Sequence, residues 1–266
     1  MAWLMKWVSG GGGGGSGGTA EDAAAQATLE EKHWPYVWAI RESEVLDWKR
    51  GLEPEQLQPL AIVQQDMPVE IMSHLYLSDA RRARDITTLK AKGITHVLNV
   101  AGLEAPSPVK EYEKEGITLL SINADDEEGY RMVENNLVEC RAFVDGVKAA
   151  GGKCVCHCVA GINRSGVTVA ALLLLERSEM TVLEAVAHCR RRRGNAFLWN
   201  HTFQRELVAL ADREGRLGPL PGEEGCCAAE ACPTKSESEA AAALFDRSGA
   251  APKKAFKAAD VKALFG

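Results

Sequence analysis

Residues 155–166 read VCHCVAGINRSG, and they carry the strongest structural signal in the chain. The apolar residues that end at Cys158 predict a buried strand, and Arg164 stands where a helix is expected to begin. Between the two lies a loop of five residues, Val159, Ala160, Gly161, Ile162 and Asn163. Successive backbone N–H groups in such a loop form a concave anion nest, which the N-terminus of the next helix reinforces. The segment therefore predicts a site for a phosphoryl group.

The side chains of this segment suggest chemistry as well as binding. Cys158 lies at the base of the positive field, which favours the thiolate, the form of cysteine that acts as a nucleophile. Arg164 supplies a planar guanidinium for two phosphate oxygens, and Gly161 permits a tight backbone turn. We expect Ser165 to donate to the Cys158 sulfur, and we interpret His157 as a structural brace of the loop. No metal or cofactor is expected, because the thiolate and Arg164 together handle the charge.

Around this segment, short apolar runs alternate with helical spacing. We expect strands at residues 69–72, 75–77, 95–100, 117–122 and 153–156. We expect helices at residues 79–92, 137–149, 164–176, 182–190 and 202–213. This alternation predicts an α/β fold with a central, mostly parallel β-sheet flanked by helices.

The Cys158–Arg164 segment resembles the signature of the cysteine-dependent protein tyrosine phosphatases. The short spacing between motifs makes the dual-specificity branch the best match. Residues 71–80 (IMSHLYLSDA) and 93–101 (GITHVLNVA) are similar to the opening strands of that family, and Asn200 and Phe203 fall where its last helix begins. The resemblance covers residues 66–213. It implies a phosphatase that removes phosphate from tyrosine and from serine or threonine through a cysteinyl-phosphate, with a phosphorylated protein as partner and a kinase as one candidate.

The family resemblance also implies a general acid, an aspartate on a loop about thirty residues before the cysteine. Four acidic residues, Asp125 to Glu128, follow the expected strand 117–122. We assign the acid to Asp126, which lies 32 positions before Cys158, and we keep Asp125 as the alternative. The same carboxylate would then act as the base that activates water. A solvated acidic turn is the alternative interpretation for the remaining residues.

Composition divides the chain into four parts. Residues 1–30 are rich in glycine and alanine and are expected to form a flexible leader. Residues 31–65 form an N-terminal extension, expected to hold one or two short helices that pack on the main domain. Residues 66–215 form the catalytic domain, and residues 216–266 a mobile tail.

Charge and cysteine usage exclude several classes. A net charge of −6 argues against a general nucleic-acid binder and so against DNA as a partner. The longest apolar run, Val167 to Leu175, is too short to span a bilayer. The eight cysteines are placed poorly for a disulfide framework, which indicates a reducing compartment, the cytoplasm or alternatively the nucleus. The sequence leaves the oligomeric state open.

Three alternative functions remain at this point. A binding module that recognises phosphoproteins without turnover would lack Cys158 or Arg164, and both are present. The loop also resembles that of RNA 5′-triphosphatases, but residues 66–221 carry 20 basic and 21 acidic residues, too few basic for RNA. Phosphoinositide phosphatases tend to place lysine in the loop, and this loop has none.

We interpret the four arginines 190–193 as a solvated C-terminal end of a helix, where positive charge is favoured, and we expect at least one of them to help capture substrate.

Overall fold

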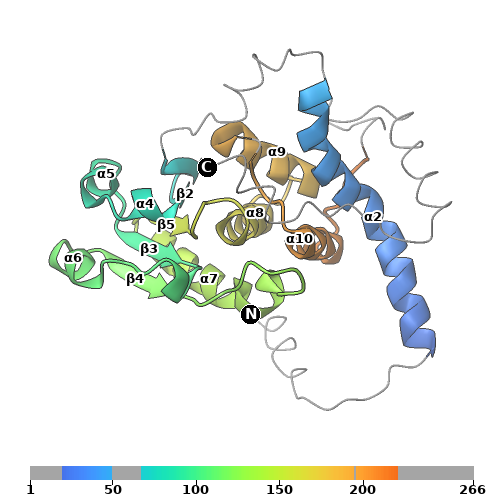
Figure 1. Cartoon of the computed structure of the whole chain (residues 1–266), viewed down its shortest axis with the longest axis horizontal. Coiled ribbons are helices and arrows are strands. Elements are labelled where there is room, and N and C mark those ends of the chain that lie inside the picture. The colour runs from blue at the N-terminus through green and yellow to red at the C-terminus, as the bar shows by residue number, and fades with distance from the viewer. Residues whose placement is uncertain (1–19, 50–66, 195, 221–266) are drawn as a thin grey trace.

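The computed structural model describes residues 20–49, 67–194 and 196–220, and its centre is a five-stranded sheet (Figure 1). The strands are β1 (Val69–Met72), β2 (Leu75–Ser78), β3 (His96–Asn99), β4 (Thr118–Ser121) and β5 (Cys154–His157). They are ordered β1-β2-β5-β3-β4, and only β1 is antiparallel to its neighbour. The predicted α/β fold with a mostly parallel sheet is confirmed.

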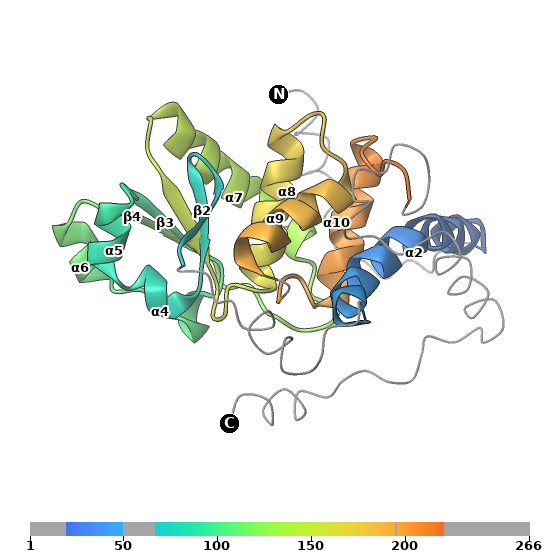
Figure 2. The ribbon, with the colours of Figure 1, turned by 90° about the horizontal axis from the view of Figure 1, so that it is seen from above.

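Helices cover both faces of this sheet (Figure 2). One face carries three short helices, α4 (Ala80–Ala83), α5 (Ile86–Ala91) and α6 (Val109–Lys114). The other face carries α7 (Met132–Ala149), α8 (Arg164–Glu176), α9 (Val182–Arg193) and α10 (His201–Arg213). Residues 164–174 of α8 are all buried, because this helix lies between the sheet and its neighbours α7, α9 and α10. An apolar helix of this kind needs cover on every side.

The register of the parallel strands brings their last residues to one edge. Ser78 of β2 is paired with His157 of β5, His157 with Asn99 of β3, and Asn99 with Ser121 of β4. Four chain segments therefore leave the sheet at the same level. In open α/β sheets, ligands bind outside the carboxyl ends of the strands. This edge is where the residues singled out from the sequence should meet.

Three helices differ from the sequence-based expectation. The single helix expected at residues 79–92 is two, because Asp79 and Asp85 each cap a new helix start by accepting the backbone N–H three residues ahead. Helix α7 begins at Met132, five residues before the expected start. Helix α6 was not expected, and its Tyr112 is buried with its hydroxyl donating to the carbonyl of Ala83.

The N-terminal part is one long helix, α2 (Ala20–Lys49), which lies against α9 and α10 (Figures 1 and 2). It includes residues 20–30 of the expected leader and continues through Pro35, so the helix has no break at residue 30, where the extension was expected to begin. Val37 and Ile40 are buried in the main core. Lys32 and His33 both contact the Asp212 carboxylate of α10, at 2.6 and 2.8 Å. The helix is therefore part of the folded unit.

The chain also stays packed beyond residue 215, where the mobile tail was expected to begin. The backbone N–H of Val182 donates to the carbonyl of Arg216, and the Arg216 guanidinium donates to the carbonyls of Leu174 and Met180. Tyr36 of α2 donates to the carbonyl of Gly218 over 2.7 Å. The rest of the predicted tail, residues 221–266, lies outside the described residues. Within the described ranges, no helix has the length and apolar character needed to cross a membrane.

Candidate active site

The loop between β5 and α8 is a tight turn whose shape depends on Gly161. This residue has a φ of +67°, a conformation that favours glycine. A Cβ atom there would lie 2.7 Å from the carbonyl oxygen of Ser78, at the end of β2. Two backbone hydrogen bonds of 3.0 Å anchor the loop: Val159 accepts from the N–H of Ala80, and Ile162 accepts from the N–H of Leu198. The predicted phosphate loop is thus held on both sides.

Cys158 and Ser165 face one another across this loop. The Ser165 hydroxyl donates to the Cys158 sulfur over 3.1 Å, and both side chains are buried. A hydrogen bond from a hydroxyl to sulfur is stronger when the sulfur is charged. The sequence predicted this pair, and the structure brings it together.

The other four cysteines of the described residues lie in apolar surroundings. Burial raises the pKa of Cys140 and of Cys189 to about 12. Burial likewise raises the pKa of Cys154 and of Cys156 far above the usual thiol range. These side chains remain thiols at neutral pH, which makes them poor nucleophiles. Cysteines 226, 227 and 232 lie outside the described residues.

Arg164 is 2% exposed and reaches toward two other loops of the same sheet edge. Its Nη1 atom donates to the Glu104 carboxylate over 2.5 Å and to the Ala124 carbonyl over 3.0 Å. Its Nε atom is buried and has no hydrogen-bond partner among the described residues. A buried donor of this kind requires an acceptor, and an oxygen of a bound phosphoryl group would supply one. The sequence does not single out Glu104, since a lone glutamate in a three-residue 3-10 helix (η1, Gly102–Glu104) carries no periodic signal.

Asp126 lies beside Arg164, with its Oδ2 atom 3.9 Å from Nε. Its carboxylate accepts hydrogen bonds from two amide side chains, Asn163 of the phosphate loop at 3.2 Å and Asn200 at 3.3 Å. Asp125, in contrast, is exposed and has no hydrogen bond or ion pair within the described part of the chain. The geometry therefore favours Asp126 over Asp125 as the acid.

His157 sits at the end of β5 with its ring buried. Its Nδ1 atom is 3.1 Å from the Cys158 carbonyl, so it carries a proton and donates to it. Burial lowers the pKa of His157 to about 4, so the ring is neutral at physiological pH. Within the described residues, the hydrogen bond of the His157 side chain goes to the backbone of Cys158, so its place in the structure suits a brace.

The four arginines 190–193 do not form a uniformly solvated helix end. Arg191 and Arg192 are exposed, but Arg190 and Arg193 are buried. Arg193 donates from Nε to the Gly161 carbonyl and from Nη2 to the Ala160 carbonyl, each over 3.1 Å. Two carbonyls of the phosphate loop are thereby turned toward Arg193 and away from a bound anion. The expectation of a solvated end is wrong for these two residues, whose i, i+3 spacing places them on the inner face of α9.

The sequence that forms this site matches the model of a known protein family. The model of the dual specificity phosphatase catalytic domain matches residues 75–213, which is just over half of the chain. The chain belongs to the dual-specificity phosphatase family. It is thus a hydrolase that acts on phosphorylated tyrosine and on phosphorylated serine or threonine in proteins, as the resemblance of the loop implied.

Individual dual-specificity phosphatases are similar to this chain over the same region. Dual specificity protein phosphatase 26 of Homo sapiens is 33% identical over 149 residues, which cover 56% of this chain and 69% of that protein. Dual specificity protein phosphatase 2 of Mus musculus is 34% identical over 163 residues, covering 60% and 48% respectively. The crystal structure of human DUSP28 aligns with a TM-score of 0.46 and 22% identity, over 55% of this chain and 93% of that one.

Proposed function

We propose that this dual-specificity phosphatase performs its reaction with Cys158, Arg164 and Asp126. The Cys158 thiolate attacks the phosphorus atom, and the bond from phosphorus to the substrate oxygen breaks. Asp126 gives its proton to that leaving oxygen. Water, activated by the same carboxylate, then attacks the cysteinyl-phosphate and releases inorganic phosphate and the thiolate. The observation that carries this proposal is that the Ser165–Cys158 hydrogen bond and the Arg164 Nε atom, which has no hydrogen-bond partner among the described residues, meet at one edge of the sheet.

The surrounding contacts assign a part to each remaining loop residue. In this proposal the backbone of residues 159–163 binds the phosphoryl oxygens, and Arg164 binds two of them in a bidentate fashion. Ser165 stabilises the thiolate when it leaves in the second step. Phosphorylated protein segments are the substrates, and exposed Arg191 and Arg192 would attract segments with acidic residues, among them the phosphorylated activation segment of a kinase.

Free thiols support a reducing compartment. All five cysteines of the described residues are unpaired and buried. We therefore include the cytoplasm, with the nucleus as the alternative, in the proposal. Fractionation of cells that express the full chain tests this, and secretion of the protein would contradict it.

A side-by-side assay tests the proposed chemistry. Purified full chain is given phosphotyrosine and phosphothreonine peptides, a phosphoinositide and an RNA with a 5′-triphosphate, with Cys158→Ser as the control. We expect hydrolysis of both peptides by the wild type and none by the variant. A clear preference for the lipid or the RNA would overturn the substrate class, and turnover by Cys158→Ser would overturn the mechanism.

A further inference from the structure

The carboxylate of Glu128, two residues after Asp126, is bound to the first turn of α10. Its Oε1 atom accepts the N–H of His201 at 3.0 Å, and its Oε2 atom accepts the N–H of Thr202 at 3.3 Å. The Thr202 hydroxyl donates to the same Oε2 at 3.0 Å. The first N–H groups of a helix have no partner within it and lie at its positive end, where a carboxylate is favoured. Glu128 therefore joins the acid-bearing loop to α10.

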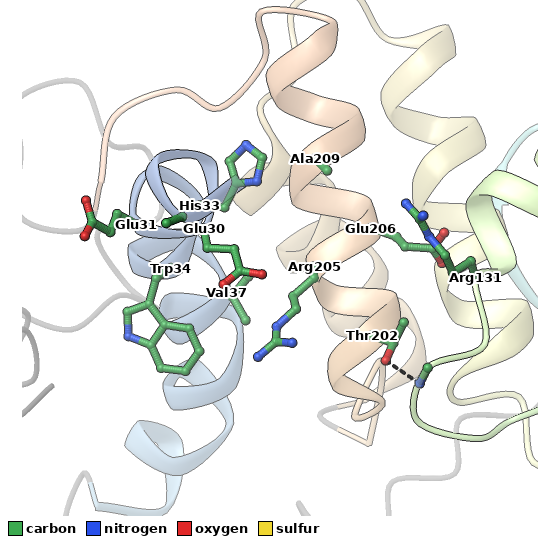
Figure 3. A pocket seen from close by; sticks show the side chains of 12 residues that line it. Glu30, Glu31, His33, Trp34, Val37, Arg131, Thr202, Arg205, Glu206 and Ala209 are labelled. Carbon is green, nitrogen blue, oxygen red and sulfur yellow. Dashed lines mark hydrogen bonds between the residues drawn. The ribbon is translucent and has the colours of Figure 1, made fainter. Parts of the chain in front are cut away.

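A second hydrogen bond runs between the same two segments. The backbone N–H of Gly129 donates to the Thr202 hydroxyl oxygen over 2.8 Å (Figure 3). Thr202 thus donates to Glu128 and accepts from the next residue along the loop. This contact borders a cavity of about 650 Å³ that is lined by residues of α2 and α10.

The start of α10 also holds Asp126 itself. Asn200 caps the helix, its side-chain oxygen accepting the N–H groups of Thr202 and Phe203. The amide nitrogen of the same side chain donates to Asp126 Oδ1 over 3.3 Å. The Asp126 carboxylate and the Glu128 carboxylate are therefore bound to one helix start, within three consecutive residues of it.

Polar contacts of this kind matter here because apolar packing does not hold the loop. Residues 125–129 are all exposed, and no apolar side chain stands among them. The Glu128 side chain is 62% exposed, and that of Asp126 is 30% exposed. A general acid must lie within hydrogen-bond reach of the oxygen it protonates, and displacement by about 1 Å is costly.

We propose that Glu128 is a positioning residue that sets the place of Asp126 by binding Thr202. The inference rests on the proposed role of Asp126 as the acid. Glu128 touches neither the loop 159–163 nor Arg164 among the described residues, so it acts only through the loop. A purely structural role, as a cap of α10, would change stability without changing proton transfer, and the two roles separate in the following experiment.

Two substrates with different needs for the acid are compared in variants of the full chain. The aryloxide of an activated aryl phosphate leaves without a proton, whereas the alkoxide of phosphothreonine requires one. We expect Glu128→Ala and Thr202→Val to lower kcat on phosphothreonine peptide about three- to tenfold, a part of the ~10²-fold loss that a 1 Å misplacement of a catalytic group can cause. On the aryl phosphate kcat should change less than twofold, and KM should stay constant for both.

Three controls accompany these variants. Glu127→Gln changes the charge of the neighbouring side chain, which is exposed and has no partner in the described part of the chain, and it should behave as wild type. Thr202→Ser keeps the hydroxyl and should retain the phosphothreonine rate. In an Asp126→Asn background, Glu128→Ala should have no further effect, since the proton it helps to place is gone.

Equal losses on both substrates would overturn the proposal, and so would an undiminished phosphothreonine rate in Glu128→Ala. A full further loss in the Asp126→Asn background would overturn it too. Failure of the proposed function is distinguishable, because it would appear as turnover by Cys158→Ser or as an Asp126→Asn variant with wild-type rates.

Discussion

The Ser165 hydroxyl donates to the Cys158 sulfur over 3.1 Å, at the junction of strand β5 and helix α8. Both groups are buried, so the hydrogen bond is shielded from water. The bond matters most when the sulfur is negatively charged, which in the proposed mechanism is the case before attack and again when the sulfur leaves phosphorus. In the second step of the proposed mechanism, hydrolysis of the cysteinyl-phosphate, Asp126 gives no proton to the sulfur. Ser165 should therefore contribute more to the rate of this step than to that of the first.

Replacing Ser165 by alanine should therefore make hydrolysis of the intermediate rate-limiting. Loss of a hydrogen bond to a charged group corresponds to about 10- to 100-fold in rate. Rapid-quench measurement with an aryl phosphate should show a burst of the aryl alcohol equal to the enzyme concentration, followed by slow turnover. A linear time course with kcat and kcat/KM lowered equally would instead place the effect of Ser165 in the first step.

Cys158→Ser should abolish turnover and keep phosphopeptide binding. The proposed nucleophile is lost, but the backbone of the loop and the Arg164 guanidinium, which we propose bind the phosphoryl group, remain. Fluorescence titration with a labelled phosphotyrosine peptide measures the affinity. Adding Arg164→Met to this variant serves as the control and should remove most of the binding. Equal affinity of the single and double variants would show that Arg164 does not contact the phosphate.

Asp126→Asn should slow phosphothreonine hydrolysis about 10²- to 10⁴-fold, the usual contribution of a general acid. The loss on an activated aryl phosphate should be much smaller. Asp125→Asn is the matched control and should stay within a few-fold of the wild type, because its side chain has no partner in the described part of the chain. Exchange of the two behaviours would assign the acid to Asp125, and small effects in both would require another proton source.

Gly161→Ala should damage both stability and activity. Its φ of +67° costs a residue with a Cβ about 1–2 kcal/mol, and that Cβ would lie 2.7 Å from the Ser78 carbonyl oxygen. We expect urea unfolding to show a free energy of unfolding lowered by about 2 kcal/mol or more, with a large drop in kcat/KM. Gly146→Ala in α7 is the control. A Cβ there meets nothing within 4 Å, and alanine in a helix interior should raise stability by about 0.5–1 kcal/mol.

How much the sequence predicted depends on how local each interaction is. The Cys158–Ser165 pair lies within eight consecutive residues, so its geometry follows from the strand, loop and helix that contain it. The bond from Arg193 to Gly161 joins residues 32 apart, and four identical arginines give no hint of which one is buried. The one signal is their position on the helix. Residues 190 and 193 lie on the same face of α9 as Val186 and Cys189, which are buried.

Long-range polar contacts account for the other omissions. The ion pair between Arg164 and Glu104 spans 60 residues and needs the register of β3 against β5 to form. The break between α4 and α5 did have a local signal, because Asp79 and Asp85 both stand at helix N-cap positions. The long helix α2 has no clear signal in the sequence, because Pro35, a residue that usually interrupts a helix, lies within it.

The final prediction concerns the stability of the fold in acid. Burial lowers the pKa of His157 to about 4 in the folded protein, against about 6.5 in the unfolded chain. Below pH 6.5 the unfolded chain therefore binds a proton that the folded protein does not, and stability falls as the pH drops from 6.5 toward 4. This one group should lower the free energy of unfolding by about 2 kcal/mol between pH 7 and pH 5.

Urea unfolding of the wild type and of His157→Gln at pH 7 and pH 5 isolates the contribution of the imidazole. Glutamine retains a donor for the Cys158 carbonyl, which His157 Nδ1 contacts at 3.1 Å, but it does not titrate in this range. The other titrating groups are the same in both proteins, so their effects cancel in the difference. We expect the wild type to lose about 2 kcal/mol more than the variant on acidification. Equal losses would mean that the His157 ring accepts a proton as readily in the folded protein as in the unfolded chain, in conflict with its burial at the end of β5.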